Sequence, residues 1–430
     1  MFINNHTYYS LRYGTIAPRV LLEYFQKAAI QHFAITDINT TSACLEILRL
    51  ASKFGVKPTI GVDFRNGAQQ QFIMYAQNNQ GFHHINTYLS HFLHNETKIP
   101  EVAQTLPHTF VVYPFQQYKK ETLSENEYLG VRAEDLNRLK FSPWKKQLHK
   151  LVGLHTLSFQ DAKGFNTHRL LRAIDNNTLL SKLPITEQGS ATAIFISRET
   201  LQKQFEEFPE LLENAKELLE RCHVSFDFSK ETPNNKRCFS NSEAEDSQLL
   251  KKLTYDGLGY RYGTNPEQHI LLRIEKELNI IEQKGFVSYF LINWHILEYA
   301  RNKGYFYVGR GSGANSVVAY LLRITDVDPI ELDLYFERFI NLYRKNPPDF
   351  DIDFSWADRD DVTEFIFKNF KNTALLTVYN TFKYKASVRE LGKVFGLPKA
   401  EIDVLSSGRY QFRSLDRLSK LVVTYSKRIE

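Results

Sequence analysis

Three aspartates alternate with large apolar residues in one short run of the sequence. Because neighbouring side chains of a β-strand point to opposite faces, a strand here would carry the carboxylates on one face and the apolar side chains on the other. Carboxylates crowded on one face repel one another unless a cation lies between them, and hard oxygen ligands suit Mg²⁺ or Mn²⁺. The aspartates are Asp349, Asp351 and Asp353, and the apolar residues are Phe350, Ile352 and Phe354.

A glycine-rich loop precedes this run. Gly309, Gly311 and Gly313 lie within residues 308–316, and residues without a β-carbon let several backbone N–H groups turn towards one ligand. The apolar residues 317–322 follow, and they predict a helix whose N-terminus would attract an anion. The loop is therefore a candidate phosphate cradle, although such a loop alone is weak evidence.

Together the two segments indicate a nucleotidyl-transfer centre. Such a centre holds a triphosphate beside metal ions that activate the attacking hydroxyl and neutralise the leaving group. Arg338 and Arg344 lie between the segments, and a planar guanidinium can bind phosphate through two hydrogen bonds. Taken alone, the aspartate run could instead be a Ca²⁺ site or an exposed sheet edge.

Five motifs in this region occur in the order and spacing found in a known enzyme family. They are residues 285–292, 308–316, 324–329, 336–339 and 348–354. In these motifs the chain resembles the α subunit of bacterial DNA polymerase III, a family C DNA polymerase. The loop departs from the commoner family form, because Val308-Gly309 replaces Pro-Gly and Asn315 replaces a glycine.

The resemblance implies roles for individual residues. Gly311 and Ser312 match the pair that meets the incoming triphosphate, and Arg338 matches an arginine that reaches the same phosphates. Two of the aspartates match metal ligands; Asp349 and Asp351 are favoured, and Asp353 is kept as an alternative. The complete candidate set is Asp349, Asp351 and Asp353 for metal and catalysis, and Arg310, Gly311, Ser312, Arg338 and Arg344 for phosphate.

The first 230 residues alternate between strand and helix patterns. Residues 33–37 and 59–64 predict strands, and residues 41–54 between them predict a helix. This repetition indicates an α/β layer or barrel whose functional loops follow the strands. Three side chains of metal-ligating type lie at the ends of predicted strands or just after one: Asp37 and Asp63 at strand ends, and His6 after a short strand.

These segments resemble the PHP domain, the polymerase and histidinol phosphatase domain that precedes the polymerase core in family C enzymes. Active members hold metals with clustered His, Asp and Glu for phosphoester hydrolysis. Here Asn4 and Ile38 stand where the motif has histidine, and the loss of two imidazoles should abolish tight metal binding. We therefore expect His6, Asp37 and Asp63 to form a degenerate site in a scaffold domain; a working phosphoesterase or 3′-exonuclease is the alternative.

Composition restricts the class of protein. With 430 residues the chain should form two or three domains, and 43% apolar with 24% charged residues is ordinary for globular proteins. No run approaches the roughly 18 apolar residues of a membrane helix, so we expect a cytoplasmic protein without a membrane partner. The three cysteines are odd in number and far apart, which indicates neither a disulfide framework nor a zinc site.

Positive charge gathers near the C-terminus. The net charge is +5, but residues 371–430 contain 12 Lys and Arg against 5 Asp and Glu. Residues 384–395 predict a helix with Lys385, Arg389 and Lys393 along one stripe. We expect this stripe to bind DNA phosphates; a solvated helical face is the alternative.

The polar residues 230–236 mark the best domain boundary. We expect a PHP-like domain over 1–232, the first part of a palm over 233–380 with a strand at 373–379, and the start of a thumb over 381–430. The predicted fold class is therefore α/β: a barrel-like PHP-type domain, then a partial nucleotidyltransferase palm of the polymerase β-like type, then the start of a helical thumb.

The expected function is template-directed deoxynucleotidyl transfer in bacterial DNA replication, with primer–template DNA and deoxynucleoside triphosphates as partners. By the resemblance, a third catalytic aspartate and the fingers lie beyond Glu430, so the chain alone should not polymerise DNA. The sliding clamp and other replisome subunits should likewise bind through regions outside it. The non-enzyme alternative is a DNA-binding scaffold without turnover.

Overall fold

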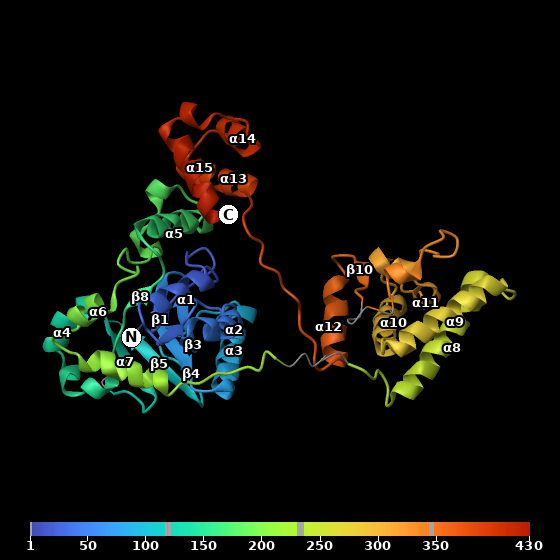
Figure 1. The fold of residues 1–430 in the computed structure, drawn as a ribbon, viewed down its shortest axis with the longest axis horizontal. Helices are drawn as coiled ribbons and strands as arrows, with labels where there is room; N and C mark the ends of the chain where they lie inside the picture. The colour runs from blue at the N-terminus through green and yellow to red at the C-terminus, as the bar shows by residue number, and fades with distance from the viewer. Residues whose placement is uncertain (1, 117, 119–121, 230–235, 342, 344–347) are drawn as a thin grey trace. The chain divides into compact units, whose positions relative to one another are not determined.

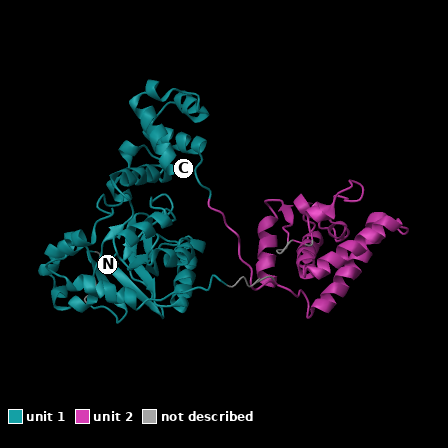
Figure 2. Cartoon of the chain, in the orientation of Figure 1, with its two compact units in different colours: residues 1–230, 380–430 teal, residues 231–379 magenta. Residues whose placement is uncertain are grey.

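A computed structural model describes residues 2–116, 118, 122–229, 236–341, 343 and 348–430. The chain forms two compact units (Figure 2). The first unit combines residues 1–230 with residues 380–430, and the second unit consists of residues 231–379. The second unit is therefore an insertion between the two parts of the first.

A six-stranded sheet forms the centre of the first unit (Figure 1). Its strands follow one another in chain order, with β2–β3 parallel, β3–β4–β5 antiparallel and β5–β6–β7 parallel. A further parallel pair, β1–β8, joins the N-terminus to a later strand. The bounds are β1 Asn4–Asn5, β2 His32–Ile35, β3 Lys57–Asn66, β4 Gln69–Ala76, β5 Thr109–Pro114, β6 Glu127–Val131, β7 Leu151–Gly153 and β8 Thr156–Leu157.

Both faces of this sheet are buried. On β4, Phe72 and Met74 enter a core that includes residues of α1, α2 and α3, whereas Ile73 and Tyr75 enter a second core with α7. Alternate residues of one strand therefore fill two cores, which is why the strands read as nearly continuous apolar runs. This arrangement confirms the predicted barrel-like α/β architecture. The helices are α1 Pro18–Lys27, α2 Cys44–Phe54, α3 Asn79–His94, α4 Leu136–Lys140, α6 Arg198–Gln204 and α7 Glu210–Glu220.

The segment expected to begin a thumb packs within the first unit. Helices α13 (Tyr384–Phe395), α14 (Lys399–Ser407) and α15 (Arg417–Ile429) share an apolar core with α5 (Ala162–Asp175). Leu170 and Ala173 of α5 contribute to this core. The sequence pattern does not predict this long-range contact.

The second unit is mainly helical (Figure 1). Its two strands, β9 (Tyr307–Arg310) and β10 (Asp351–Phe354), pair with each other in antiparallel orientation. The short 3-10 helices η6 (Gly311–Asn315) and η7 (Phe336–Arg338) lie in the segments between these strands. The α-helices are α8 Glu243–Tyr262, α9 Gln268–Gln283, α10 Val287–Asn302, α11 Val317–Leu321 and α12 Arg359–Asn369.

The prediction of a strand at residues 373–379 is wrong. The segment has no regular secondary structure, and Leu375, Leu376 and Val378 are 68%, 95% and 78% exposed. Its β-branched and apolar residues suit a strand, but a strand also needs a neighbour with free backbone groups. Within the part of the chain that the structure describes, no strand pairs with this segment.

Candidate functional site

The predicted carboxylate strand and the glycine-rich loop lie against each other in the second unit. β10 runs antiparallel to β9, and Asp351 lies directly opposite Arg310. Ile352 and Phe354 pack against the apolar core of the unit, so the alternating aspartates lie on the other face. The side chains of Asp351 and Asp353 are 40% and 58% exposed, which leaves them open to ligands.

The guanidinium of Arg310 lies between these two carboxylates. Its Nε donates to Asp353 Oδ2 at 2.7 Å, its Nη2 to Asp353 Oδ1 at 3.4 Å, and its Nη1 to Asp351 Oδ2 at 3.2 Å. The hydrogen bond and charge of Asp353, with the charge of Asp351, raise the pKa of Arg310. The cation that crowded carboxylates require is supplied here by the loop's own arginine.

The third aspartate of the run, Asp349, precedes β10 and has an exposed side chain. Phe350 fixes the start of the strand, because its N–H donates to the Tyr289 hydroxyl at 2.8 Å and its ring stacks on that of Tyr289 at 5.3 Å. Among the described residues, Arg310 contacts the other two aspartates and not Asp349. Arg344 lies outside the residues that the structure describes.

Glycines are required where the loop meets the carboxylate strand. Gly311 has φ +77°, and a β-carbon there would lie 2.6 Å from Asp351 Oδ2. A β-carbon on Gly309 would lie 1.8 Å from the Ile324 carbonyl oxygen. Gly311 therefore lets the loop approach Asp351 closely, and Gly309 lets β9 approach the backbone at Ile324. Ser312, the other predicted phosphate ligand of this loop, is half-buried beside them.

The N-terminus of α11 already holds an anion. Glu277 of α9 is fully buried, and its Oε2 accepts hydrogen bonds from the Ser316 hydroxyl at 2.8 Å and from Val318 N–H at 3.3 Å. Burial raises the pKa of Glu277, and the charge of Arg273 opposes this. The anion at this helix end is thus a carboxylate of the chain itself.

Arg273 joins the loop to the segment that carries Arg338. Its Nε donates to Glu277 Oε1 at 2.7 Å, and its Nη2 donates to the carbonyl oxygens of Asn315 at 3.2 Å and Leu334 at 2.9 Å. Arg338 itself is exposed, at the end of η7. The sequence analysis missed Arg273 and Glu277; the available signal was an Arg–Glu pair four residues apart on an otherwise apolar helix face.

In the first unit, His6 and Asp63 lie together at the predicted degenerate site. Asp63 Oδ2 accepts from His6 Nε2 at 3.0 Å, and from Nε and Nη2 of Arg65 at 3.0 Å and 2.6 Å. Gln70 and Asn4 donate to the same oxygen at 2.9 Å and 3.3 Å. Asp63 Oδ1 is buried and has no hydrogen-bond partner among the described residues. A guanidinium therefore neutralises this predicted metal-ligating carboxylate.

The electrostatics of this cluster follow from its burial. Burial opposes ionisation of Asp63, yet the charge of Arg65 holds the pKa of that carboxyl well below its usual range. Burial also lowers the pKa of His6. The sequence analysis missed Arg65, although its position two residues after Asp63 in a buried strand places both on one face.

Asp37, the third predicted residue of this site, has a different set of partners. Its oxygens accept from Thr7 N–H at 2.6 Å, Thr7 Oγ1 at 2.7 Å and Ser10 Oγ at 2.6 Å. Burial raises the pKa of Asp37, and the hydrogen bonds from Ser10 and Thr7 oppose this rise. The carboxylate thus holds the N-terminal turn in place. Ile38 forms a β-bridge to Asp63 and offers no ligand atom.

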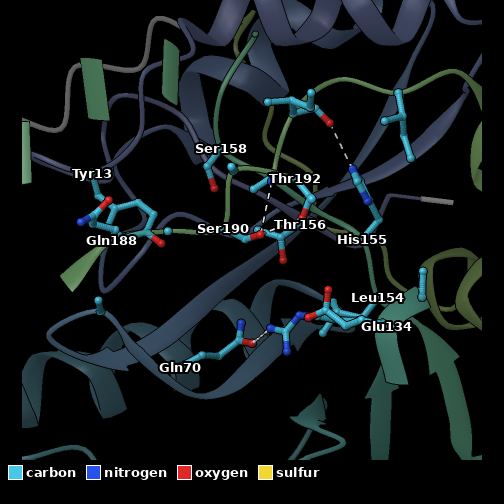
Figure 3. Close-up of a pocket in the computed structure, with 18 of the residues that line it drawn as sticks. Tyr13, Gln70, Glu134, Leu154, His155, Thr156, Ser158, Gln188, Ser190 and Thr192 are labelled. Carbon is cyan, nitrogen blue, oxygen red and sulfur yellow. Dashed lines mark hydrogen bonds between the residues drawn. The ribbon is translucent and has the colours of Figure 1, made fainter. Parts of the chain in front are cut away.

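A cavity of about 520 Å³ borders the degenerate site (Figure 3). Gln70 lies on one side of it, and Ser190 and Thr192 lie on another, with their hydroxyls 2.7 Å apart. Arg132 also lines the cavity and donates a 2.8 Å hydrogen bond to Gln70. Arg65 also lines the cavity, but it is already paired with Asp63. The cavity is polar, and the described residues around it do not assemble a metal site.

The predicted basic stripe of α13 is exposed, as its spacing indicates. Lys385, Arg389 and Lys393 all face solvent. Arg389 lies 3.7 Å from Asp403, and Lys393 lies 2.7 Å from Glu390. The stripe is therefore partly neutralised within its own unit.

The donor set of the second unit fits a divalent ion bound together with substrate. Among the described residues, no group of three or more His, Cys, Asp or Glu side chains could hold a metal ion. Two carboxylates nevertheless share one cation here, the Arg310 guanidinium, and Mg²⁺ is usually held by one or two carboxylates with phosphates and water completing its shell.

In the described ranges, no helix is long and apolar enough to cross a membrane.

Two family models match the chain. Residues 3–228, just over half of it, match the model described as PHP domain, and residues 248–421 match the bacterial DNA polymerase III alpha NTPase domain. The chain belongs to the bacterial DNA polymerase III α family. DNA polymerases and PHP domains are in general metal-dependent, which agrees with carboxylates at both sites.

Similar proteins of the DNA polymerase III α family cover almost the whole chain. The DNA polymerase III subunit alpha of Halalkalibacterium halodurans is 29% identical over 95% of this chain and 40% of its own length. That of Streptococcus pyogenes is 28% identical over 90% of this chain and 37% of its own length. An error-prone DNA polymerase of Symbiobacterium thermophilum is 39% identical over 48% of this chain and 19% of its own length. The chain thus spans about two fifths of the length of the two α subunits.

Proposed function

We propose that the second unit provides the metal- and triphosphate-binding part of a DNA-directed DNA polymerase that extends a primer on template DNA in the bacterial cytoplasm. One observation carries the proposal: the β9–β10 register brings Asp351 and Asp353 around a cation that comes from the glycine-rich loop. Carboxylates that share a cation next to a phosphate-binding loop are the arrangement that nucleotidyl transfer needs.

In this proposal Asp351 and Asp353 hold Mg²⁺ or Mn²⁺, with Asp349 as a third ligand candidate. The bound ion supplies charge neutralisation at the triphosphate and lowers the pKa of the attacking 3′-hydroxyl. Arg310 and Arg338 contribute guanidinium groups to the phosphates, because a planar fork binds phosphate oxygens in pairs. The deoxynucleoside triphosphate is thereby held at the end of β9.

Other residues fix the position of the loop. Gly311 allows the backbone to approach Asp351, and Ser312 offers a half-buried hydroxyl beside it. Arg273 and Glu277 hold the far end of the loop by hydrogen bonds to carbonyl oxygens and to the start of α11. Positioning of this kind matters because misplacement of reacting groups by about 1 Å can cost about a hundredfold in rate.

The proposed partners follow from the same family. Primer–template DNA contacts the basic stripe of α13 through phosphates, and a sliding clamp with other replisome subunits binds other parts of the polymerase. A phosphoesterase or 3′-exonuclease in the first unit is not favoured, because Arg65 neutralises Asp63 and Ile38 offers no ligand. The first unit instead serves as a scaffold.

The test is primer extension by the gene product that contains these residues. An Asp351→Asn, Asp353→Asn double variant should lower extension on the order of a thousandfold, since loss of charge stabilisation at a reacting phosphate costs several kcal/mol. The matched control is Asp360→Asn, an exposed aspartate of α12 in the same unit, which should extend primers as the parent does. Parent-like extension by the double variant would contradict the proposal.

A further inference from the structure

Arg310 occupies the carboxylate oxygens that a metal ion needs. Its three hydrogen bonds take up both oxygens of Asp353 and Oδ2 of Asp351. A divalent cation bound between these aspartates requires the same oxygens at shorter distances. The guanidinium and the ion therefore compete for these oxygens, and they repel each other as like charges.

The ion pairs of Arg310 with Asp351 and Asp353 are exposed and can separate easily. The Arg310 side chain is 58% exposed and its two partners are 40% and 58% exposed, so it can turn away without opening a core. The first unit contains the opposite case, in which Arg65 and Asp63 are 6% and 0% exposed and locked by further hydrogen bonds. Exposed ion pairs are weak, whereas buried ones resist separation.

We propose that Arg310 is a resident counter-ion that competes with the divalent metal for Asp351 and Asp353 until a nucleoside triphosphate draws the guanidinium away. The inference rests on the proposed function and adds a coupling to it. A guanidinium forms paired hydrogen bonds with phosphate oxygens just as it does with carboxylate oxygens. Triphosphate binding thus frees the carboxylates at the moment when its own oxygens can complete the metal shell.

The coupling has a defined sign. Without triphosphate, Arg310 lowers the affinity of the site for the metal. With triphosphate, the arginine contacts phosphate, so each ligand raises the affinity for the other by the same factor. A residue that only supported the fold would lower both affinities when removed, and a residue that only bound phosphate would leave the metal affinity unchanged.

The test measures two affinities of the chain by calorimetry, for Mn²⁺ alone and for dATP in excess EDTA. Arg310→Gln should tighten Mn²⁺ binding by about three- to tenfold, as expected for release from exposed ion pairs. The same variant should weaken metal-free dATP binding by a similar factor. Arg359→Gln is the matched control, because Arg359 is also exposed and paired with an aspartate of the second unit, Asp360 at 3.3 Å; it should change neither affinity.

Each outcome decides between the two proposals. Unchanged or weaker Mn²⁺ binding in Arg310→Gln would overturn the competition, and unchanged dATP binding would overturn the transfer of the guanidinium to phosphate. Mn²⁺ binding that persists in Asp351→Asn, Asp353→Asn would instead place the metal elsewhere and overturn the proposed function.

Discussion

Replacing Arg65 by methionine should destabilise the first unit strongly. The change keeps an unbranched side chain but leaves Asp63, which is 0% exposed, without the cation at 2.6 Å. Removing one partner of a buried ion pair costs about 3–5 kcal/mol, because the other charge stays buried. Asp63 keeps neutral donors from His6, Gln70 and Asn4, so we expect a loss near the lower end, about 3 kcal/mol.

The pH dependence of this loss follows from the Asp63 carboxyl. Its folded pKa lies below the unfolded value of about 3.9 in the parent, so its stabilisation is present above pH 4 and fades as the pH falls through the folded pKa. Without Arg65, burial raises the folded pKa above the unfolded value. The difference in unfolding free energy between parent and variant should therefore be largest at neutral pH. It should begin to shrink above pH 4, as the pH falls through the raised pKa of the variant, and should shrink further below pH 4, where the parent loses its stabilisation.

The assay is hydrogen–deuterium exchange of peptides from β3 and β4 across a denaturant series, which reports the opening of this unit alone. Arg12→Met is the control, because Arg12 also pairs with an aspartate of the same unit, Asp175 at 2.8 Å, but is 52% exposed. It should cost about 0–1 kcal/mol. An Asp63→Asn, Arg65→Met variant should recover much of the loss. A loss in Arg65→Met no larger than in Arg12→Met would refute the reasoning.

Two further predictions concern acid and salt. His168 donates from Nδ1 to the Tyr13 carbonyl and accepts at Nε2 from Gly189 N–H, both at 2.8 Å, and burial lowers its pKa to about 4. Because the unfolded histidine binds a proton below about pH 6.5, the first unit should lose about 3 kcal/mol between pH 6.5 and 4, and unfolding of His168→Gln followed against pH should show a slope smaller by about one proton. DNA binding should weaken steeply with salt, and neutralising the three side chains of the α13 stripe should reduce the logarithmic slope by up to about three phosphates at 0.9 each; a slope equal to that of the parent would show that the stripe is only solvated.

The spacing of apolar and polar residues within a short segment predicted the helix α13 and the strand β10. The helix expected over residues 384–395 is α13, Tyr384–Phe395, because its apolar spacing and the glycine that follows it are read within a few residues. The alternation of Asp351 and Asp353 with apolar residues likewise gave the strand and its two faces. The strand expected at 373–379 failed because β-propensity does not provide a pairing partner.

The sequence did not show which charged side chains pair with each other across the fold. The α11 N-terminus was expected to attract the anion of a ligand, but nothing local reveals that Glu277, some forty residues earlier, places a carboxylate there. The position of Arg310 opposite Asp351 depends on strand register, which only the assembled fold fixes. Arg65 lies on the same strand as Asp63, and only their spacing of two residues indicated this pair. The chain thus contains two arginines that pair with aspartates. The Arg65–Asp63 pair is buried and permanent, whereas the Arg310 pairs are exposed and can be released.

The contact between α5 and the last three helices has a consequence for biosynthesis. Roughly 200 residues separate α5 from α13, and ribosomes add about 5–20 residues per second. The apolar face of α5 therefore stays uncovered for about 10–40 s, until the helices α13, α14 and α15 have been synthesised. During that interval the whole insertion is synthesised and can fold, so the unit that begins first on the ribosome is the one completed last.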